Sequence, residues 1–167
     1  MLITPEYLFR SVTAIHPDFL KKLDIRALVL DVDNTLTAHG SQTLPEEVAK
    51  WLDEMKSAGI PLMIASNNTK KRVEPFANKI GLDYVAMSCK PMTFGLSRAR
   101  KKFGMAKKNI ALVGDQLFTD RLAGAIYGIK VLVVEPRGLE VNWGVKLKRV
   151  LEKPFMNRYY KRGGKLL

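Results

Sequence analysis

The sequence contains a single cysteine, Cys89, and only two histidines. One cysteine excludes an intramolecular disulfide framework and any zinc site built from several cysteines. No apolar run approaches the roughly 20 residues that a membrane-spanning helix needs. The N-terminus lacks a basic patch followed by an apolar segment and a cleavage site, so it does not have the pattern of a secretory signal. We therefore expect a cytoplasmic protein.

Acidic residues are scarce relative to basic ones, with 16 against 28 in a chain of 167 residues, which gives a formal net charge of +12. The excess is concentrated in the stretch from Lys130 to the end, where ten residues are basic and three are acidic. A surplus of this size favours anionic partners, namely phosphate esters, nucleic acid or acidic lipid surfaces, and does not choose among them. The 47% apolar and 26% charged residues are typical of a globular domain.

Short apolar runs alternate with amphipathic segments along the chain. The runs are mostly continuous, as in parallel strands that are covered on both faces. This alternation predicts an α/β fold with a single Rossmann-like, doubly wound parallel sheet. The predicted strands are 27–32, 61–65, 84–86, 110–113 and 130–134, in the spatial order 5-4-1-2-3. The predicted helices are 44–58, 70–80, 91–103, 118–127 and 143–152, with one or two short helices in 1–26 and a basic, aromatic tail after 152.

Polar residues follow the predicted strands at their carboxyl ends, where ligands bind in open α/β sheets. These residues are Asp31, Asp33, Ser66, Lys90, Asp115 and Asp120. Four carboxylates at one rim repel one another unless a cation neutralises them, and an all-oxygen set favours Mg²⁺. Together with a lysine and a serine that can hold phosphate oxygens, the set indicates phosphoryl transfer.

The same residues carry a resemblance to a family. Four stretches of the chain match, in order, the four motifs of the haloacid-dehalogenase-like (HAD) phosphatases. They are Asp31-Val32-Asp33-Asn34-Thr35, Ser66, Lys90 and Gly114-Asp115-Gln116-Leu117-Phe118-Thr119-Asp120. The match covers 27–134, and the chain as a whole resembles the small YqeG-like group within subfamily IIIA. The resemblance implies one HAD-like phosphatase domain over 1–167. Its parts would be an N-terminal packing segment (1–26), a catalytic core (27–135) and a basic C-terminal helix and tail (136–167).

The resemblance also implies a role for each motif residue. Asp31 would be the nucleophile, Asp33 the general acid and base, and Lys90 the catalytic cation. Thr35 would order the first motif. The phosphate-binding residues would be Thr35, Ser66, Asn67 and Lys90, and the Mg²⁺ ligands would be Asp31, the carbonyl of Asp33, Asp115 and, directly or through water, Asp120.

The spacing between motifs limits what the site can hold. Asp31 and Ser66 are 35 positions apart and Ser66 and Lys90 are 24 apart, which leaves no room for an inserted cap domain. An open site suits a large substrate, a phosphate on a membrane surface, or a partner subunit that acts as a lid. In this family an aspartate at position 33 goes with phosphatases and phosphomutases, because fast hydrolysis of a phospho-aspartate needs a nearby base. The open site argues against a phosphomutase, which must keep its intermediate from water.

Other interpretations exist for several residues. Asp115, Thr119 or Asp120 could cap a helix. Cys89 is expected to be a small packed residue, His16 structural, His39 a surface residue near the substrate, and both tryptophans packed in the core or against the tail.

The function favoured by the sequence is that of a Mg²⁺-dependent phosphomonoester hydrolase with an aspartyl-phosphate intermediate. Phosphatidylglycerophosphate is one candidate substrate, with peripheral contact to an anionic membrane at its inner face. The alternatives are a phosphatase for a soluble sugar phosphate, nucleotide or nucleic-acid end, and a non-catalytic basic protein that binds RNA or ribosomes. A capless site also invites a homo-oligomer.

Overall fold

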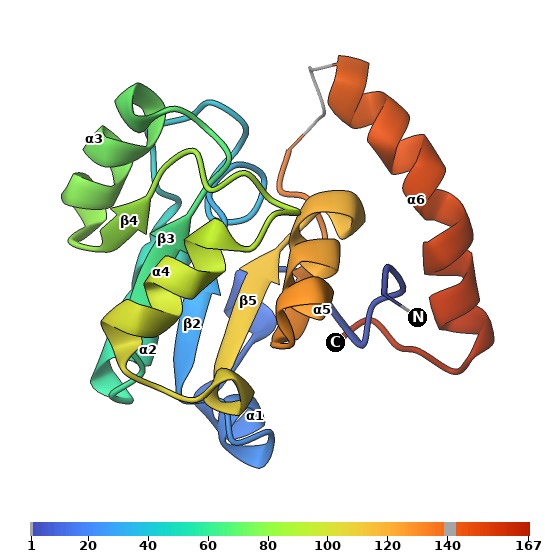
Figure 1. Cartoon of the computed structure of the whole chain (residues 1–167), viewed down its shortest axis with the longest axis horizontal. Helices are drawn as coiled ribbons and strands as arrows, with labels where there is room; N and C mark the ends of the chain where they lie inside the picture. Colours follow the sequence, from blue (N-terminus) through green and yellow to red (C-terminus); the bar gives the residue numbers. More distant parts are fainter. Residues whose placement is uncertain (1, 139–142) are drawn as a thin grey trace.

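A computed structural model describes residues 2–138 and 143–167. Its centre is a six-stranded sheet in the order β1-β6-β5-β2-β3-β4, and every neighbouring pair is parallel (Figure 1). The strands are β1 (Tyr7–Phe9), β2 (Ala27–Leu30), β3 (Leu62–Ala65), β4 (Asp83–Val85), β5 (Ile110–Gly114) and β6 (Lys130–Val134). The five predicted strands and their spatial order are therefore confirmed, and the sheet has one further strand.

The additional strand, β1, corrects the expectation that 1–26 is purely helical. Tyr7, Leu8 and Phe9 pair with Leu132, Val133 and Val134 at the edge of the sheet. A three-residue strand has no pattern of its own that distinguishes it from a turn of helix. Its pairing partner lies more than a hundred residues away, so the strand is defined by a tertiary contact. The expected helices follow it as a short 3₁₀ turn, η1 (Val12–Ala14), and α1 (Pro17–Lys22).

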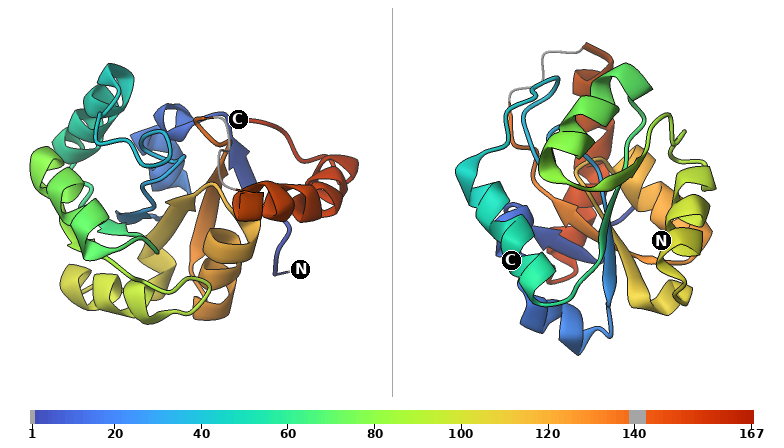
Figure 2. Two further views of the ribbon diagram at one scale, coloured as in Figure 1. Left: turned by 90° about the horizontal axis from the view of Figure 1, so that it is seen from above. Right: turned by 90° about the vertical axis from the view of Figure 1, so that its left-hand side faces the viewer.

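Helices cover both faces of the sheet, so the predicted doubly wound architecture is confirmed (Figure 2). On one face, side chains of α1, α2 (Glu46–Ser57) and α3 (Lys70–Ile80) pack in one apolar cluster with the sheet. On the other face, α4 (Phe94–Phe103) and α5 (Leu122–Tyr127) pack in a second cluster. A 3₁₀ turn, η2 (Lys107–Asn109), leads into β5, and a π-helical turn, η3 (Leu117–Arg121), leads into α5.

The C-terminal helix α6 (Trp143–Lys161) is longer than predicted. The sequence indicated a helix that ends near Glu152, but the helix continues through Pro154. Proline inside a helix removes one backbone hydrogen bond. After Pro154, the side chains of Phe155, Met156 and Tyr159 pack with the second apolar cluster. Their burial offsets the loss of that hydrogen bond.

The chain after α6 returns to the edge of the sheet. Leu166 forms an isolated parallel bridge with Leu8, and the Leu167 N–H donates to the Leu8 carbonyl at 2.9 Å. The Tyr159 hydroxyl donates to the Lys165 carbonyl at 2.8 Å, and Gly164 lies against the Tyr159 ring. This segment covers the exposed edge of β1, which limits the tendency of an edge strand to pair with other chains.

Two local expectations are confirmed and two are wrong. Trp51 is buried, and its indole N–H donates to the Ile15 carbonyl at 2.7 Å. His16 directly precedes α1, where its carbonyl accepts from the Phe19 N–H at 3.0 Å, and its Nδ1 lies 3.6 Å from Glu54 Oε1, which fits a structural role. Trp143 is 76% exposed because it lies on the outer face of α6. Cys89 is exposed rather than packed, and it lies in the loop between β4 and α4 with a positive φ of 55°.

The links between the first strands are short. α2 is the helix between β2 and β3, and α3 is the helix between β3 and β4, so neither stretch of described chain contains a cap domain, as predicted. Over 2–138 and 143–167, no helix combines the length and the apolar character that a bilayer crossing requires.

Candidate functional site

The site begins with a buried lysine between two carboxylates. Lys90 Nζ lies 2.6 Å from Asp31 Oδ1 and 2.6 Å from Asp120 Oδ1. Asp31 directly follows β2, Lys90 follows β4, and Asp120 belongs to η3 after β5. All three side chains are buried. Strand ends that are far apart in the sequence therefore meet at one rim, as expected for a parallel sheet.

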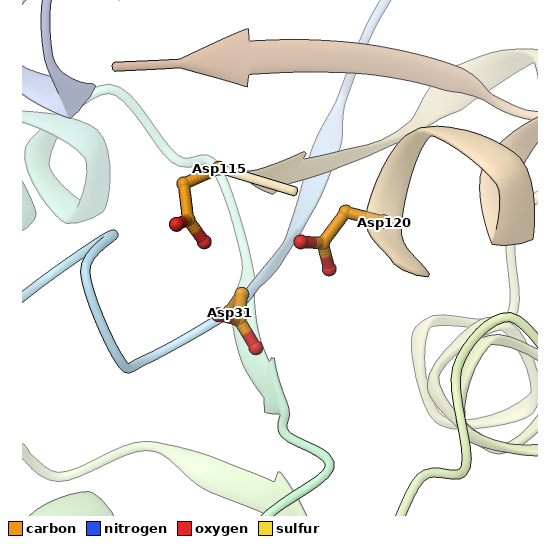
Figure 3. Close-up of side chains that lie close together, drawn as sticks. All are labelled: Asp31, Asp115 and Asp120. Carbon is orange, nitrogen blue, oxygen red and sulfur yellow. The ribbon is translucent and has the colours of Figure 1, made fainter. Parts of the chain in front are cut away.

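Asp115 completes a cluster of three carboxylates. One oxygen each from Asp31, Asp115 and Asp120 lies within 4.8 Å of the others (Figure 3). The approach of Asp120 depends on Gly114 at the end of β5, because a Cβ at position 114 would lie 2.6 Å from Asp120 Cβ. The π-helical turn η3 places Asp120 at this point, with the Asp120 N–H bound to the Gln116 carbonyl at 2.9 Å. Such turns often occur at functional sites.

Burial and mutual repulsion dominate the ionisation of this cluster. Burial raises the pKa of Asp31 to about 7, against the opposing attraction of Lys90, and Asp120 adds to the rise. Burial also raises the pKa of Asp115 well above its ordinary value, with Arg149 opposing it. Burial acts to lower the pKa of Lys90, but Asp120 and Asp31 outweigh it and keep that pKa above its ordinary value. With all of these carboxylates ionised, burial and mutual repulsion would therefore make the negative charge of the cluster unfavourable.

Asp33 lies beside this cluster, and its carboxylate is held by three donors. Its Oδ1 accepts from the Gly40 N–H at 2.7 Å and from Arg72 Nη2 at 2.8 Å, and its Oδ2 accepts from Asn68 Nδ2 at 3.1 Å. Burial acts to raise the pKa of Asp33, but these hydrogen bonds and the Arg72 charge keep that pKa below its ordinary value. Asp33 is therefore ionised in this arrangement.

The remaining predicted residues hold the loops of the site in place. The Thr35 hydroxyl donates to Asp115 Oδ1 at 3.3 Å, which fits the predicted ordering of the first motif. Ser66 is buried, and its Oγ accepts the Asn68 N–H at 3.1 Å. The Asn67 side chain binds the Lys90 backbone on both sides, since Oδ1 accepts from Lys90 N at 2.6 Å and Nδ2 donates to Lys90 O at 2.8 Å. Asn67 thus positions Lys90.

His39 lies in the loop after the first motif. It is exposed, as expected of a surface residue, and its backbone N–H donates to Asn34 Oδ1 at 3.2 Å.

Two residues of α6 reach the site without any signal in the motifs. Arg149 contacts Asp115 Oδ2 through Nη2, and its Nη1 donates to the Asp115 carbonyl at 2.6 Å and to Glu152 at 3.0 Å. Glu152 is buried and accepts the Leu117 N–H at 2.6 Å. Arg72, on α3, also escaped the sequence analysis. Arg72 and Arg149 lie in helices whose other basic residues are exposed, so only the tertiary structure distinguishes these two arginines from their neighbours.

The donor set at the cluster fits a hard divalent cation. The three grouped residues offer carboxylate oxygens alone, without imidazole or thiolate, and magnesium prefers such ligands. Their repulsion and raised pKa values would be relieved by a bound cation. Asp33 contributes no carboxylate to the group.

The fold and this site define a class of protein. Residues 38–128 match the family model described as haloacid dehalogenase-like hydrolase, and the chain belongs to this family. The chain is 28% identical to the Bacillus subtilis (strain 168) protein named "Probable phosphatase YqeG", over 95% of this chain and 92% of the relative. The predicted resemblance to the HAD family and its YqeG-like group is confirmed.

Two further similarities are more distant. The chain is 24% identical to "Phosphatidylglycerophosphate phosphatase 1, chloroplastic/mitochondrial" of Arabidopsis thaliana, over 96% of this chain but only 49% of the relative, so it spans about half of that protein. A solved structure from Legionella pneumophila, described as a HAD superfamily (subfamily III A) hydrolase, aligns with a TM-score of 0.56 at 19% identity, over 72% of this chain and 70% of that one. At this identity, the likeness concerns the fold.

Proposed function

We propose that this protein is a Mg²⁺-dependent phosphomonoester hydrolase that works through an aspartyl-phosphate. The observation that carries the proposal is the convergence of Asp31, Asp115 and Asp120, within 4.8 Å of one another, beside the ammonium of Lys90. A pure polyanion-binding protein has no use for clustered buried carboxylates. We propose that the whole chain forms one domain with 27–135 as its catalytic core.

In the first step, an Asp31 oxygen would attack phosphorus while the bond to the leaving oxygen breaks and Asp33 gives that oxygen a proton. In the second step, water would attack phosphorus, Asp33 would take the proton of the water, and the bond to Asp31 would break to release phosphate. The ionised Asp33 suits the second step as it stands, whereas the first step requires its protonation against the hydrogen bonds from Gly40 and Arg72.

Mg²⁺, held by Asp31, the Asp33 carbonyl, Asp115 and Asp120, would supply positive charge that stabilises the transferring phosphoryl group. Lys90 would neutralise the nucleophile and the phosphoryl oxygens, since its Nζ already lies 2.6 Å from Asp31. Thr35, Ser66 and Asn67 surround the same rim and complete the proposed phosphate pocket, Asn67 by fixing the Lys90 backbone.

For the natural substrate, we propose a phosphomonoester on a lipid head group such as phosphatidylglycerophosphate. The support is the Arabidopsis relative, whose similarity covers 96% of this chain, together with the absence of a cap domain in the described links between β2 and β4. A soluble sugar phosphate, nucleotide or nucleic-acid end is the alternative substrate.

The test is hydrolysis of an aryl phosphate with and without Mg²⁺. The wild type is expected to turn over only with Mg²⁺, and acid quenching during turnover should trap phosphate on Asp31, seen by peptide mass spectrometry. Asp31→Asn should lose turnover while circular dichroism stays unchanged. A fully active Asp31→Asn variant would refute the mechanism, and salt-sensitive RNA binding without any turnover would favour the non-catalytic alternative. A panel of lipid and soluble phosphate esters then identifies the substrate.

A further inference from the structure

The outer face of α6 is apolar although it is exposed. We define this face as Trp143, Leu147, Val150 and Leu151, which are 76%, 46%, 55% and 53% exposed. Their spacing of three and four residues places them on one side of two helical turns. The opposite side carries the buried Glu152 and Tyr159. A cluster of large apolar side chains on the surface marks a contact with another molecule.

The exposed charges on α6 are all positive. They belong to Lys146, Lys148, Lys153, Arg158 and Lys161, and the acid of this helix, Glu152, is buried against Arg149 and the Leu117 N–H. An apolar stripe beside lysines offers the two contributions that hold a protein on an anionic membrane surface, which are burial of apolar side chains and attraction to anionic lipid head groups. Two copies of this face would bring like charges together, and RNA would leave the apolar stripe without a partner.

A second exposed apolar group flanks the catalytic lysine. Met87, Met92 and Phe94 are 64%, 60% and 68% exposed. Met87 and Met92 lie on either side of Lys90 in the loop between β4 and α4, and Phe94 is the first residue of α4. This loop and the N-terminal end of α6 lie at the end of the molecule where the strands terminate (Figure 1). Arg149 of α6 contacts Asp115 of the acid cluster, so the helix is joined directly to the site.

We propose that the outer face of α6, together with Met87, Met92 and Phe94, docks the protein on an anionic phospholipid surface. α6 starts at this end of the molecule and then runs back alongside the sheet (Figure 1), so docking through its N-terminal part and the loop around Lys90 would place the acid cluster toward the bilayer, where it would meet a phosphomonoester on a lipid head group. This part of the inference rests on the proposed function, whereas membrane binding itself does not require catalysis.

The test combines vesicle flotation with tryptophan fluorescence. Trp143 is exposed and Trp51 is 2% exposed, so a change in emission on vesicle binding reports Trp143. With phosphatidylglycerol-containing vesicles, we expect flotation and a blue shift of the emission, and with pure phosphatidylcholine vesicles neither. The double variant Leu147→Ser/Leu151→Ser should bind about tenfold more weakly or worse. Its hydrolysis of a soluble aryl phosphate should stay unchanged.

Ile126→Ser is the matched control, because Ile126 is an apolar residue of α5 with a similar exposure of 58%. The control should float like the wild type. Flotation of the double variant at wild-type affinity, or no binding of the wild type at low salt, would overturn the proposal. So would a dimer of the wild type that the double variant abolishes, or RNA binding that competes with the vesicles. Intact flotation of the wild type without any turnover of the aryl phosphate would instead count against the proposed function and leave the docking surface standing.

Discussion

Arg149 of α6 binds Asp115 twice, through its carboxylate Oδ2 and through its backbone carbonyl at 2.6 Å. The Asp115 side chain is fully buried, and Arg149 is the cation that acts against the rise of its pKa. A residue of a helix outside the four motifs therefore influences the ionisation and the orientation of the Asp115 side chain, which is a proposed metal ligand. Partners of this kind commonly alter metal affinity when they are removed.

Replacing this arginine should weaken metal binding. We expect Arg149→Met to lower Mg²⁺ affinity by about tenfold near neutral pH, because Asp115 would then hold a proton more tightly. The loss should shrink at higher pH, where Asp115 ionises without help. Isothermal titration with Mg²⁺ at two pH values measures this. Arg149→Lys should restore part of the affinity, and Lys148→Met, at an exposed neighbour, should have no effect. Tighter Mg²⁺ binding in Arg149→Met would show that the guanidinium and the metal compete.

The stabilisation by Mg²⁺ should depend on pH. The folded-state pKa of Asp31 is raised to about 7, above its ordinary value of 3.8, so the folded protein holds this proton more tightly than the unfolded chain does. That contribution to stability is complete below the unfolded pKa and is lost as pH rises through about 7. Mg²⁺ must displace the proton at low pH. The rise in Tm on adding Mg²⁺ should therefore be larger near pH 8 than near pH 5.

Differential scanning calorimetry with and without Mg²⁺ measures this difference. Asp31→Asn removes one of the two proposed ligands whose pKa is raised, so its Mg²⁺-induced rise in Tm should vary less with pH than that of the wild type, and Asp115 accounts for the remaining variation. An equal rise at both pH values in the wild type would contradict the assignment of Asp31 as a ligand.

Arg72 should set the pH range of catalysis. Its guanidinium binds Asp33 at 2.8 Å and contributes to the low pKa of that carboxylate. In Arg72→Met the pKa of Asp33 should rise. With saturating Mg²⁺, which displaces the proton of Asp31, the acidic limb of the pH–rate profile for an aryl phosphate should then move to higher pH. Lys71→Met, at the exposed neighbouring position, is the control. A profile that coincides with the wild type would mean that Asp33 does not limit the rate.

The segment after α6 should contribute measurably to stability. In Gly164→Ala the new Cβ would lie within 2.6 Å of Tyr159 ring carbons, which displaces the segment that covers β1. We expect a loss of about 1–3 kcal/mol in the free energy of unfolding. Gly138→Ala is the control, since its Cβ would meet only ordinary contacts at 3.5 Å. Urea denaturation compares the two, and equal stabilities would argue that the segment moves aside freely.

The central sheet and the acid cluster could be predicted because their signals are local. Continuous apolar runs marked β2, β3, β5 and β6, and glycines marked the ends of the helices between them. Parallel topology then brought Asp31, Lys90 and Asp120 to one rim, since each follows a strand. The roles of these residues in catalysis stay predictions.

The features that were missed depend on distant contacts. β1 is a strand only because β6 lies beside it, and α6 continues past Pro154 because Tyr159 and its neighbours are buried. Arg72 and Arg149 are single basic residues in helices that carry many, and only their buried partners distinguish them. The exposure of Trp143 could not be predicted either, because the helical spacing of apolar residues around it is equally compatible with a buried side chain.

The pairing of β1 with β6 sets an order on assembly during translation. β2 can meet β3 as soon as both have left the ribosome, since they are adjacent in the sequence and in the sheet. Tyr7–Phe9 emerges before them, yet its partner strand Lys130–Val134 is made some 120 residues later. In the nascent chain, the apolar segment of β1 therefore has no partner strand while the rest of the sheet folds. A chaperone that covers this segment would act during that interval.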